Sequence, residues 1–158
     1  MTAWDLPSPF IHRITAQAGD IDIFGHANNA AYLRWADETA WAHWEADGLT
    51  RQHCLDADRG MAIVRTEADY LGHIRAAEAL DCAVWIAQSD GRLRAERWYQ
   101  FRRGATGETV FRAVTKLVCF QLSTGRPARM TGPFAAHYAV PEPELAAAAG
   151  AFMTHLTR

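Results

Sequence analysis

Residues 20–48 read DIDIFGHANNAAYLRWADETAWAHWEADG, a polar segment followed by a stretch of helical periodicity. In that stretch, apolar and aromatic residues recur every three or four positions, which is typical of a helix with one buried face. These residues are Tyr32, Trp35, Ala36, Ala40, His43 and Trp44. Asn28 or Asn29 can cap the first turn, and Gly48 stands where a C-terminal cap is expected. The sequence therefore predicts one long helix from about Asn29 to Asp47.

Strand patterns lie on both sides of this helix. One strand is predicted over residues 10–18, and residues 64–70 alternate between apolar and polar in the manner of a half-buried strand. Gly-containing turns join three further predicted strands, at 80–88, 93–102 and 110–121. The last of these is apolar on both faces, which favours an interior strand. A short helix over 142–154 completes an α+β fold, in which a meander of four strands and the first strand wrap around one long helix.

Composition excludes several classes of protein. The 158 residues are 49% hydrophobic and 22% charged, as expected of a soluble globular protein forming a single domain over residues 1–158. The 16 Lys and Arg against 18 Asp and Glu give a net charge of -2 without a basic cluster, so nucleic acid is not an expected partner. A signal-peptide pattern and a run of about 18 apolar residues are both missing, which predicts a cytoplasmic protein with no membrane partner. The widely spaced Cys54, Cys82 and Cys119 indicate reduced thiols rather than a zinc site.

Residues 20–29 concentrate reactive side chains just before the predicted helix. The group consists of Asp20, Asp22, His26, Asn28 and Asn29. A helix N-terminus offers unpaired N–H groups and a positive dipole end, which stabilise an oxygen that becomes negative during acyl transfer. A carboxylate beside it can act as a base or a nucleophile. The alternative is structural: the aspartates bond loop amides, an asparagine caps the helix, and Gly25 allows a turn with positive φ.

The same segment carries a family signature. It reads Asp20-x-Asp22-x-x-Gly25-His26-x-Asn28-Asn29-x-x-Tyr32-Leu33-x-Trp35. This pattern resembles the hotdog-fold acyl-CoA thioesterases of the 4-hydroxybenzoyl-CoA thioesterase-like family, and the likeness extends over about residues 10–130. The resemblance implies a hotdog fold and hydrolysis of an acyl-CoA thioester to the free acid and CoA, without a cofactor. It also implies a homodimer or homotetramer with active sites at the subunit interface.

The resemblance assigns roles to particular positions. Asp22 matches the family's catalytic carboxylate, which acts as general base or nucleophile, and the backbone N–H of Asn29 matches the group that polarises the thioester carbonyl. His26 matches a histidine beside the thioester, with packing at the helix entry as its alternative. The expected substrate-binding residues in the pattern are Asp20, Gly25, Asn28 and Tyr32.

Residues outside the signature bear on the substrate. Lys116 and four arginines can meet the phosphates of CoA, although a solvated surface charge is the alternative for each. The arginines are Arg102, Arg103, Arg126 and Arg129. Tryptophans on the helix and strands can line an acyl pocket or serve as core. Asp37 lies near the place where another hotdog branch keeps its catalytic glutamate, with a solvated or dimer-facing carboxylate as its alternative.

Two departures from the signature concern the acyl group. Ile23-Phe24 replaces the Pro-Ala of the hydroxybenzoyl enzymes, and Ala27 replaces a bulkier apolar residue. Burying a phenol without a partner costs about 1 to 3 kcal/mol, whereas each buried methylene gains about 0.8 kcal/mol. We therefore expect aliphatic or arylacetyl-type groups to be preferred over 4-hydroxybenzoyl.

Other chemistries find less support in the sequence. The seven histidines form neither HExxH nor HxH, so no metal ligands are expected, and no Gly-x-Ser-x-Gly elbow is present. A hotdog hydratase or dehydratase acting on acyl thioesters remains an alternative, but its Asp-x-Asn-Pro-x-His loop is missing. A non-catalytic acyl-CoA-binding hotdog module is the second alternative.

Overall fold

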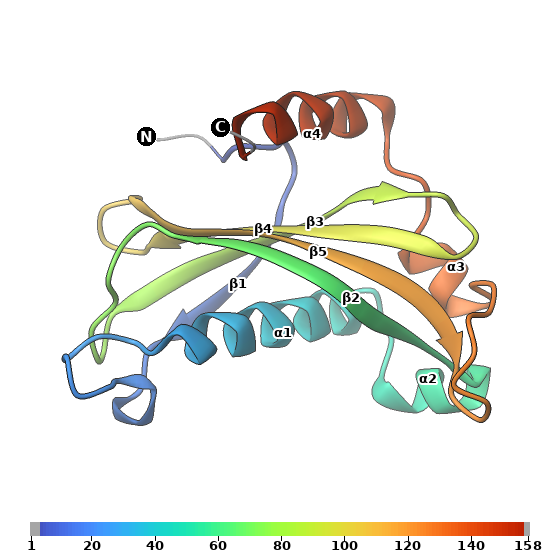
Figure 1. Ribbon diagram of the computed structural model, residues 1–158, viewed down its shortest axis with the longest axis horizontal. Helices are drawn as coiled ribbons and strands as arrows, with labels where there is room; N and C mark the ends of the chain where they lie inside the picture. Colours follow the sequence, from blue (N-terminus) through green and yellow to red (C-terminus); the bar gives the residue numbers. More distant parts are fainter. Residues whose placement is uncertain (1–3, 157–158) are drawn as a thin grey trace.

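An antiparallel sheet curls around one long helix, as Figure 1 shows for this computed structural model, which describes residues 4–156 and the side chains of residues 4–149. The strands in this part of the chain are β1 (Phe10–Thr15), β2 (Arg59–Tyr70), β3 (Ala79–Ser89), β4 (Arg94–Arg103) and β5 (Thr109–Gln121). They lie in the order β1-β3-β4-β5-β2. The predicted α+β architecture, with a sheet wrapped around one helix, is confirmed.

The long helix α1 spans Asn29–Ala46, within one residue of its predicted end. The side chain of Asn28 caps it by accepting a hydrogen bond from the Ala31 N–H. Gly48 follows with φ +78°, a conformation that glycine adopts without strain. The buried face packs against the sheet, and Trp35 at its centre is only 1% exposed. Truncating such a buried aromatic side chain costs about 3 to 5 kcal/mol, so this face holds the helix in place.

The four-strand meander predicted after the helix is wrong in one respect. β3, β4 and β5 do form consecutive hairpins, but β2 lies at the edge of the sheet and pairs with β5. β3 pairs with β1 on its other side, so it has no free edge for β2. The connection at residues 71–78 contains Ile74, which is fully buried and whose carbonyl accepts a hydrogen bond from the Ala27 N–H at 2.7 Å.

Two helices cover opposite faces of the sheet (Figure 1). α1 lies on one face, and α4 (Pro143–Leu156) packs on the other against residues of β3 and β4 that include Trp85 and Trp98. β5 runs between β4 and β2, and Phe111 and Val114 are buried on its opposite faces. The expectation of an interior strand is thus confirmed.

Three short elements were not predicted. They are the 3-10 helix η1 (Ala18–Asp20), α2 (Arg51–Ala57) and α3 (Pro133–His137). Consequently β1 ends at Thr15 rather than at residue 18, and β2 begins at Arg59 rather than at residue 64. α2 starts with an unusual reciprocal cap, in which His53 Nδ1 accepts a hydrogen bond from Thr50 N–H at 2.9 Å. Capping sequences normally carry Glu or Gln at that position, which is why the pattern gave no signal.

Two further expectations concern cysteines and membranes. Cys54, Cys82 and Cys119 are free thiols, and burial raises the pKa of all three. Among the helices within residues 4–156, none combines the length and apolar character needed to span a bilayer.

Candidate active site

The loop before α1 is a narrow hairpin. Ile21 and Ala27 form an antiparallel bridge, and the Asp22 N–H donates to the His26 carbonyl at 2.8 Å. At the tip, the Gly25 N–H donates to the Asp22 carbonyl at 3.0 Å. Gly25 has φ +77°, so a side chain at this position would strain the turn. The hairpin therefore fixes where the Asp22 backbone lies relative to the helix.

Asp20 anchors this hairpin. Its side chain is nearly buried, accepts a hydrogen bond from Gln17 N–H at 2.8 Å and pairs with Arg34 one helical turn into α1. Its carbonyl accepts from both the backbone N–H and the side-chain amide of Asn28, at 2.8 and 3.1 Å. Both carboxylate oxygens of Asp20 are thus occupied, and the residue ties the loop to the helix cap.

Asp22 has the opposite environment. Its side chain is exposed, and one carboxylate oxygen accepts a hydrogen bond from Phe24 N–H at 2.8 Å. Within the described part of the chain, the other carboxylate oxygen has no partner. The hydrogen bond to Phe24 holds the side chain in one orientation and leaves an oxygen available to an incoming molecule.

Asn29 is the first residue of α1 and is exposed. The Asn28 side chain satisfies Ala31 N–H at 2.9 Å, but among residues 4–156 the Asn29 N–H finds no acceptor. This free donor lies at the positive end of an 18-residue helix. It can hold a carbonyl oxygen and stabilise negative charge that develops there.

His26 lies beside a segment that the sequence did not associate with the site. Its ring stacks on His73, with centroids 4.1 Å apart and planes 12° apart. The two histidines line a cleft together with Gly72, Arg75, Glu78, Arg103 and Glu108. Arg103 is held by Glu78 and Glu108, whereas the Arg75 guanidinium has no ion pair or hydrogen bond in the described residues. His73 and Arg75 lie far from the signature in sequence, so no local pattern could identify them.

Tyr32 and Lys116 lie away from the exposed loop groups. The Tyr32 ring is buried among other aromatic rings, and its hydroxyl donates to the Gly72 carbonyl at 2.9 Å. Burial raises the pKa of this hydroxyl. Lys116 shares the β5 face of Val114, on the side of α4 and opposite α1, and its Nζ lies 3.8 Å from Glu96. One chain therefore gathers the loop residues of the signature but leaves Lys116 on the other face of the sheet.

An apolar cavity of about 350 Å³ lies near the far end of α1. Trp41, Trp44 and Met61 contribute to its lining, and Asp37 also borders it. Asp37 is 8 positions after Asn29, so at 1.5 Å per residue the cavity begins about 12 Å along the helix from the free N–H. Within one chain, this cavity does not adjoin the loop. The tryptophans Trp35, Trp85 and Trp98 belong to the hydrophobic core rather than to this cavity.

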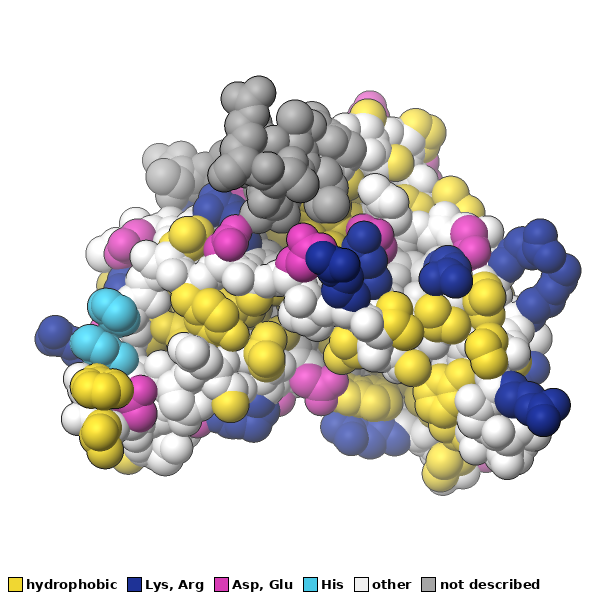
Figure 2. Space-filling view, viewed as in Figure 1, with side chains coloured by type: hydrophobic (Ala, Val, Ile, Leu, Met, Phe, Trp, Pro, Cys, Tyr) yellow, Lys and Arg dark blue, Asp and Glu magenta, His cyan; other side chains and the backbone are white. Residues whose placement is uncertain are grey.

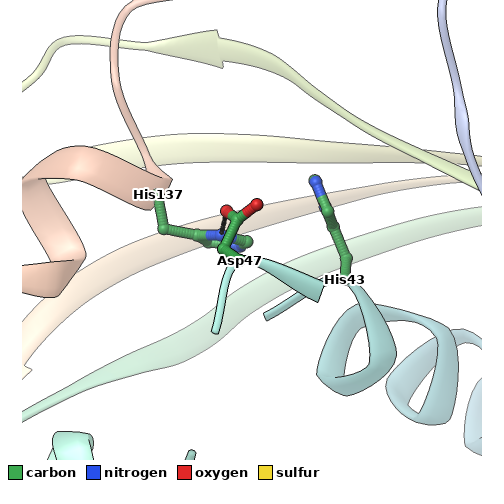
Figure 3. A group of neighbouring side chains, drawn as sticks. All are labelled: His43, Asp47 and His137. Atoms are coloured by element: carbon green, nitrogen blue, oxygen red, sulfur yellow. Dashed lines mark hydrogen bonds and ion pairs between the residues drawn. The ribbon is translucent and has the colours of Figure 1, made fainter. Parts of the chain in front are cut away.

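A second polar cluster lies at the same far end of α1. His43, Asp47 and His137 place one possible ligand atom each within 4.8 Å of the others (Figure 3). The i, i+4 spacing of His43 and Asp47 is visible in the sequence, but His137 follows 90 residues later. This cluster was not predicted, and it is separate from the loop around Asp22.

Comparison with known proteins places the chain in a family. The sequence profile of the thioesterase-like superfamily matches residues 16–145. The chain belongs to this superfamily. The resemblance to the hotdog thioesterases is thereby confirmed, and with it the expectation of a thioesterase. No curated protein sequence matches the chain.

Solved structures support the same fold. A 1,4-dihydroxy-2-naphthoyl-CoA thioesterase from Synechocystis is 18% identical, with a TM-score of 0.75 over 83% of this chain and 96% of that one. A DHNA-CoA thioesterase from Staphylococcus aureus is also 18% identical, with a TM-score of 0.72 over 92% and 91%. A second Staphylococcus aureus protein, solved in complex with CoA, is 16% identical, with a TM-score of 0.74 over 92% and 95%. These likenesses confirm the hotdog fold.

Proposed function

We propose that this thioesterase hydrolyses acyl-CoA thioesters, with Asp22 and the Asn29 N–H as its catalytic groups. The observation that carries the proposal is that the loop presents a free carboxylate oxygen on Asp22 and that α1, which follows it, presents a free backbone N–H on Asn29. The two groups belong to one rigid hairpin and helix cap, which Asp20 and Asn28 hold together. CoA-linked substrates in the names of solved relatives support this choice of substrate class.

The proposed reaction assigns one task to each group. The thioester carbonyl oxygen accepts a hydrogen bond from the Asn29 N–H, which stabilises the negative charge of the tetrahedral intermediate. Asp22 either takes a proton from an attacking water or attacks the carbonyl carbon itself to form an anhydride that water then cleaves. In both routes the carbon–sulfur bond breaks, the CoA thiolate leaves and becomes protonated, and the free acid is released.

Other residues of the hairpin have supporting tasks in this proposal. Asp20, through Gln17 and Arg34, is a positioning residue for the loop. Gly25 permits the tight turn, and Asn28 keeps the helix cap in place. Tyr32 supports the site from the core, because its hydroxyl is already bonded to Gly72. His26 offers one face of the cleft beside the loop.

We assign recognition of the CoA phosphates to the cleft beside His26. Arg75 lines this cleft and lacks a carboxylate partner within residues 4–149, so it can pair with a phosphate without first breaking an ion pair. Lys116 is paired with Glu96 on the opposite face of the sheet, which favours the alternative that it is a surface charge and does not bind CoA. The expected effect of Arg75→Gln is a rise in KM for acyl-CoA with little change in kcat.

We further propose that the protein works as a homodimer or homotetramer that joins through β2. This strand lies at the edge of the sheet, and hydrophobic side chains gather over it and at the tip of the loop (Figure 2). Ile63 and Val64 on β2 are more than half exposed, and Ile23 and Phe24 at the loop tip are 94% and 77% exposed. An exposed apolar edge strand is suited to pairing with a second copy. The apolar loop tip then helps to complete an acyl pocket.

Release of free thiol from a panel of acyl-CoAs tests the function. We expect turnover with octanoyl-CoA and phenylacetyl-CoA that exceeds turnover with 4-hydroxybenzoyl-CoA, because Ile23 and Phe24 offer the acyl group an apolar surface. A tenfold advantage in kcat/KM for the hydroxybenzoyl thioester would reverse the proposed preference. Tight binding of acyl-CoA without thiol release across the panel would instead support the non-catalytic binding module.

A further inference from the structure

Three side chains of types that can bind a metal ion meet at the end of α1 that lies away from the proposed active site. His43 is in the last turn of the helix, Asp47 caps it, and His137 ends α3 (Figure 3). His137 Nδ1 lies 2.6 Å from a carboxylate oxygen of Asp47, and the ligand atoms of all three residues lie within 4.8 Å of one another. Two imidazoles and a carboxylate are a ligand set typical of Zn²⁺.

The contact between the buried His137 and Asp47 marks the place where an ion binds in this cluster. Its side chain has no exposed surface, yet its Nε2 has no hydrogen-bond partner. When Nδ1–H is donated to Asp47, Nε2 carries a lone pair that nothing in the described residues satisfies. An ion that takes the place of the Nδ1 proton binds Nδ1 and the Asp47 carboxylate together, and the ring proton then lies on Nε2.

We propose that His43, Asp47 and His137 bind a divalent transition-metal ion of the Zn²⁺ class, which clamps α3 to the end of α1. Asp47 is about half exposed, so the ion can enter from solvent, and a water molecule can complete its coordination. The carboxylate also offsets the repulsion between the ion and Arg97, a cation whose charge acts on both histidines.

The two histidines of the cluster lie in a largely buried, aromatic environment. Burial lowers the pKa of His43 to about 4 and also lowers the pKa of His137, although Asp47 acts in the opposite direction on both. Aromatic rings enclose the pair: Phe10 stacks on His43 at 4.9 Å, and Trp44 meets His137 edge to face at 5.0 Å.

The metal site is structural and distinct from the thioesterase site. His43 follows Asn29 by 14 positions, which corresponds to about 21 Å along the helix. The clamp joins segments that are 90 residues apart in the chain. The proposal therefore predicts that the ion raises stability while the chelator-treated protein keeps its hydrolytic activity.

Titration of the chelator-treated full chain with Zn²⁺ and with Co²⁺ tests the site. We expect one equivalent of Zn²⁺ per chain by calorimetry, a visible Co²⁺ absorption band that Zn²⁺ abolishes, and a Tm rise of about 5 °C at saturation. The decisive variant is His43→Phe, which keeps the stack on Phe10 and removes the ligand nitrogen. Its matched control is His53→Ala, which removes an exposed histidine on α2.

The outcomes separate clearly. Loss of binding in His43→Phe and Asp47→Asn, with binding retained in His53→Ala, supports the site. Equal binding in His43→Phe and the unaltered protein overturns it. If His43→Phe does not fold, the unaltered protein still decides, because a missing Co²⁺ band at one equivalent also overturns the site.

Discussion

The two ends of α1 differ in how they present an unpaired polar group. Near its N-terminal end, Asp22 is exposed and keeps one carboxylate oxygen free. Near its C-terminal end, His137 is enclosed and one of its ring nitrogens has no hydrogen-bond partner. A free group on the surface is solvated and accessible to a substrate. A polar group in the interior that lacks a hydrogen-bond partner costs free energy. The same helix thus presents two different chemistries, one suited to turnover and one suited to holding a ligand.

The two aspartates of the loop, Asp20 and Asp22, show the same contrast between an enclosed and an exposed polar group. Asp20 is 6% exposed and uses both carboxylate oxygens to bind Gln17 and Arg34, while Asp22 is exposed and uses one. Residue type alone does not distinguish them. Their surroundings separate a carboxylate that builds the loop from one that the loop presents to solvent.

The largest expected effect comes from removing the exposed carboxylate. Asp22→Asn retains the shape of the side chain but cannot act as a base or nucleophile, so kcat should fall by about 10² to 10⁴ in the thiol-release assay. Asp37→Asn, on the other carboxylate considered for the site, should leave kcat within threefold. A reversed result, with Asp37 essential and Asp22 dispensable, would move the catalytic carboxylate to the apolar cavity.

The next largest effect on turnover is expected from substitutions on the edge strand β2. Replacing both Ile63 and Val64 with Lys should convert the oligomer to a monomer by light scattering and reduce turnover at least tenfold, because charged side chains on an edge strand oppose pairing. Val140→Lys, at an exposed apolar residue outside the sheet, is the matched control and should change neither property. A fully active monomer would contradict a site completed by two subunits.

Asp20→Asn tests the anchor rather than the chemistry. Charge-assisted hydrogen bonds contribute about 1.5 to 3 kcal/mol, so urea unfolding should show a loss within that range. Glu38→Gln breaks the exposed i, i+4 pair with Arg34 and should cost only about 0.3 to 0.5 kcal/mol. Equal losses in the two variants would mean that Asp20 is no more than a surface charge.

The smallest effect is expected from pH at the other end of the helix. Burial lowers the pKa of His43 to about 4 in the folded protein, from an ordinary value of 6.5, so the unfolded chain takes up a proton first as pH falls. The free energy of unfolding should therefore decrease between about pH 7 and pH 4 by about 1 to 2 kcal/mol, allowing for partial solvent screening. His137, Asp47 and Arg97 face the same ring, and the lowered pKa of His137 acts in the same direction.

The free energy of unfolding of His43→Phe, measured in metal-free buffer between about pH 7 and pH 4, tests whether His43 causes this pH dependence. Its stability should depend less on pH than that of the unaltered protein. An identical dependence would assign the effect to other groups.

Local signals in the sequence determined the long helix, most strand positions and the loop that precedes α1. Asn28 and Gly48 fix the helix ends because capping depends on residues within one turn, and Gly25 marks the turn for the same reason. The signature therefore identified the family and the candidate catalytic carboxylate before any contact was known.

Only the tertiary structure decided which distant segments meet. β2 joins β5 rather than β3 because β1 already occupies the free edge of β3, and periodicity carries no information about that competition. The stack of His26 on His73 and the approach of His137 to Asp47 likewise depend on how the sheet brings separate segments together. Side chains that are 47 or 90 positions apart leave no local pattern, because their contact energy is realised only when the whole core is packed.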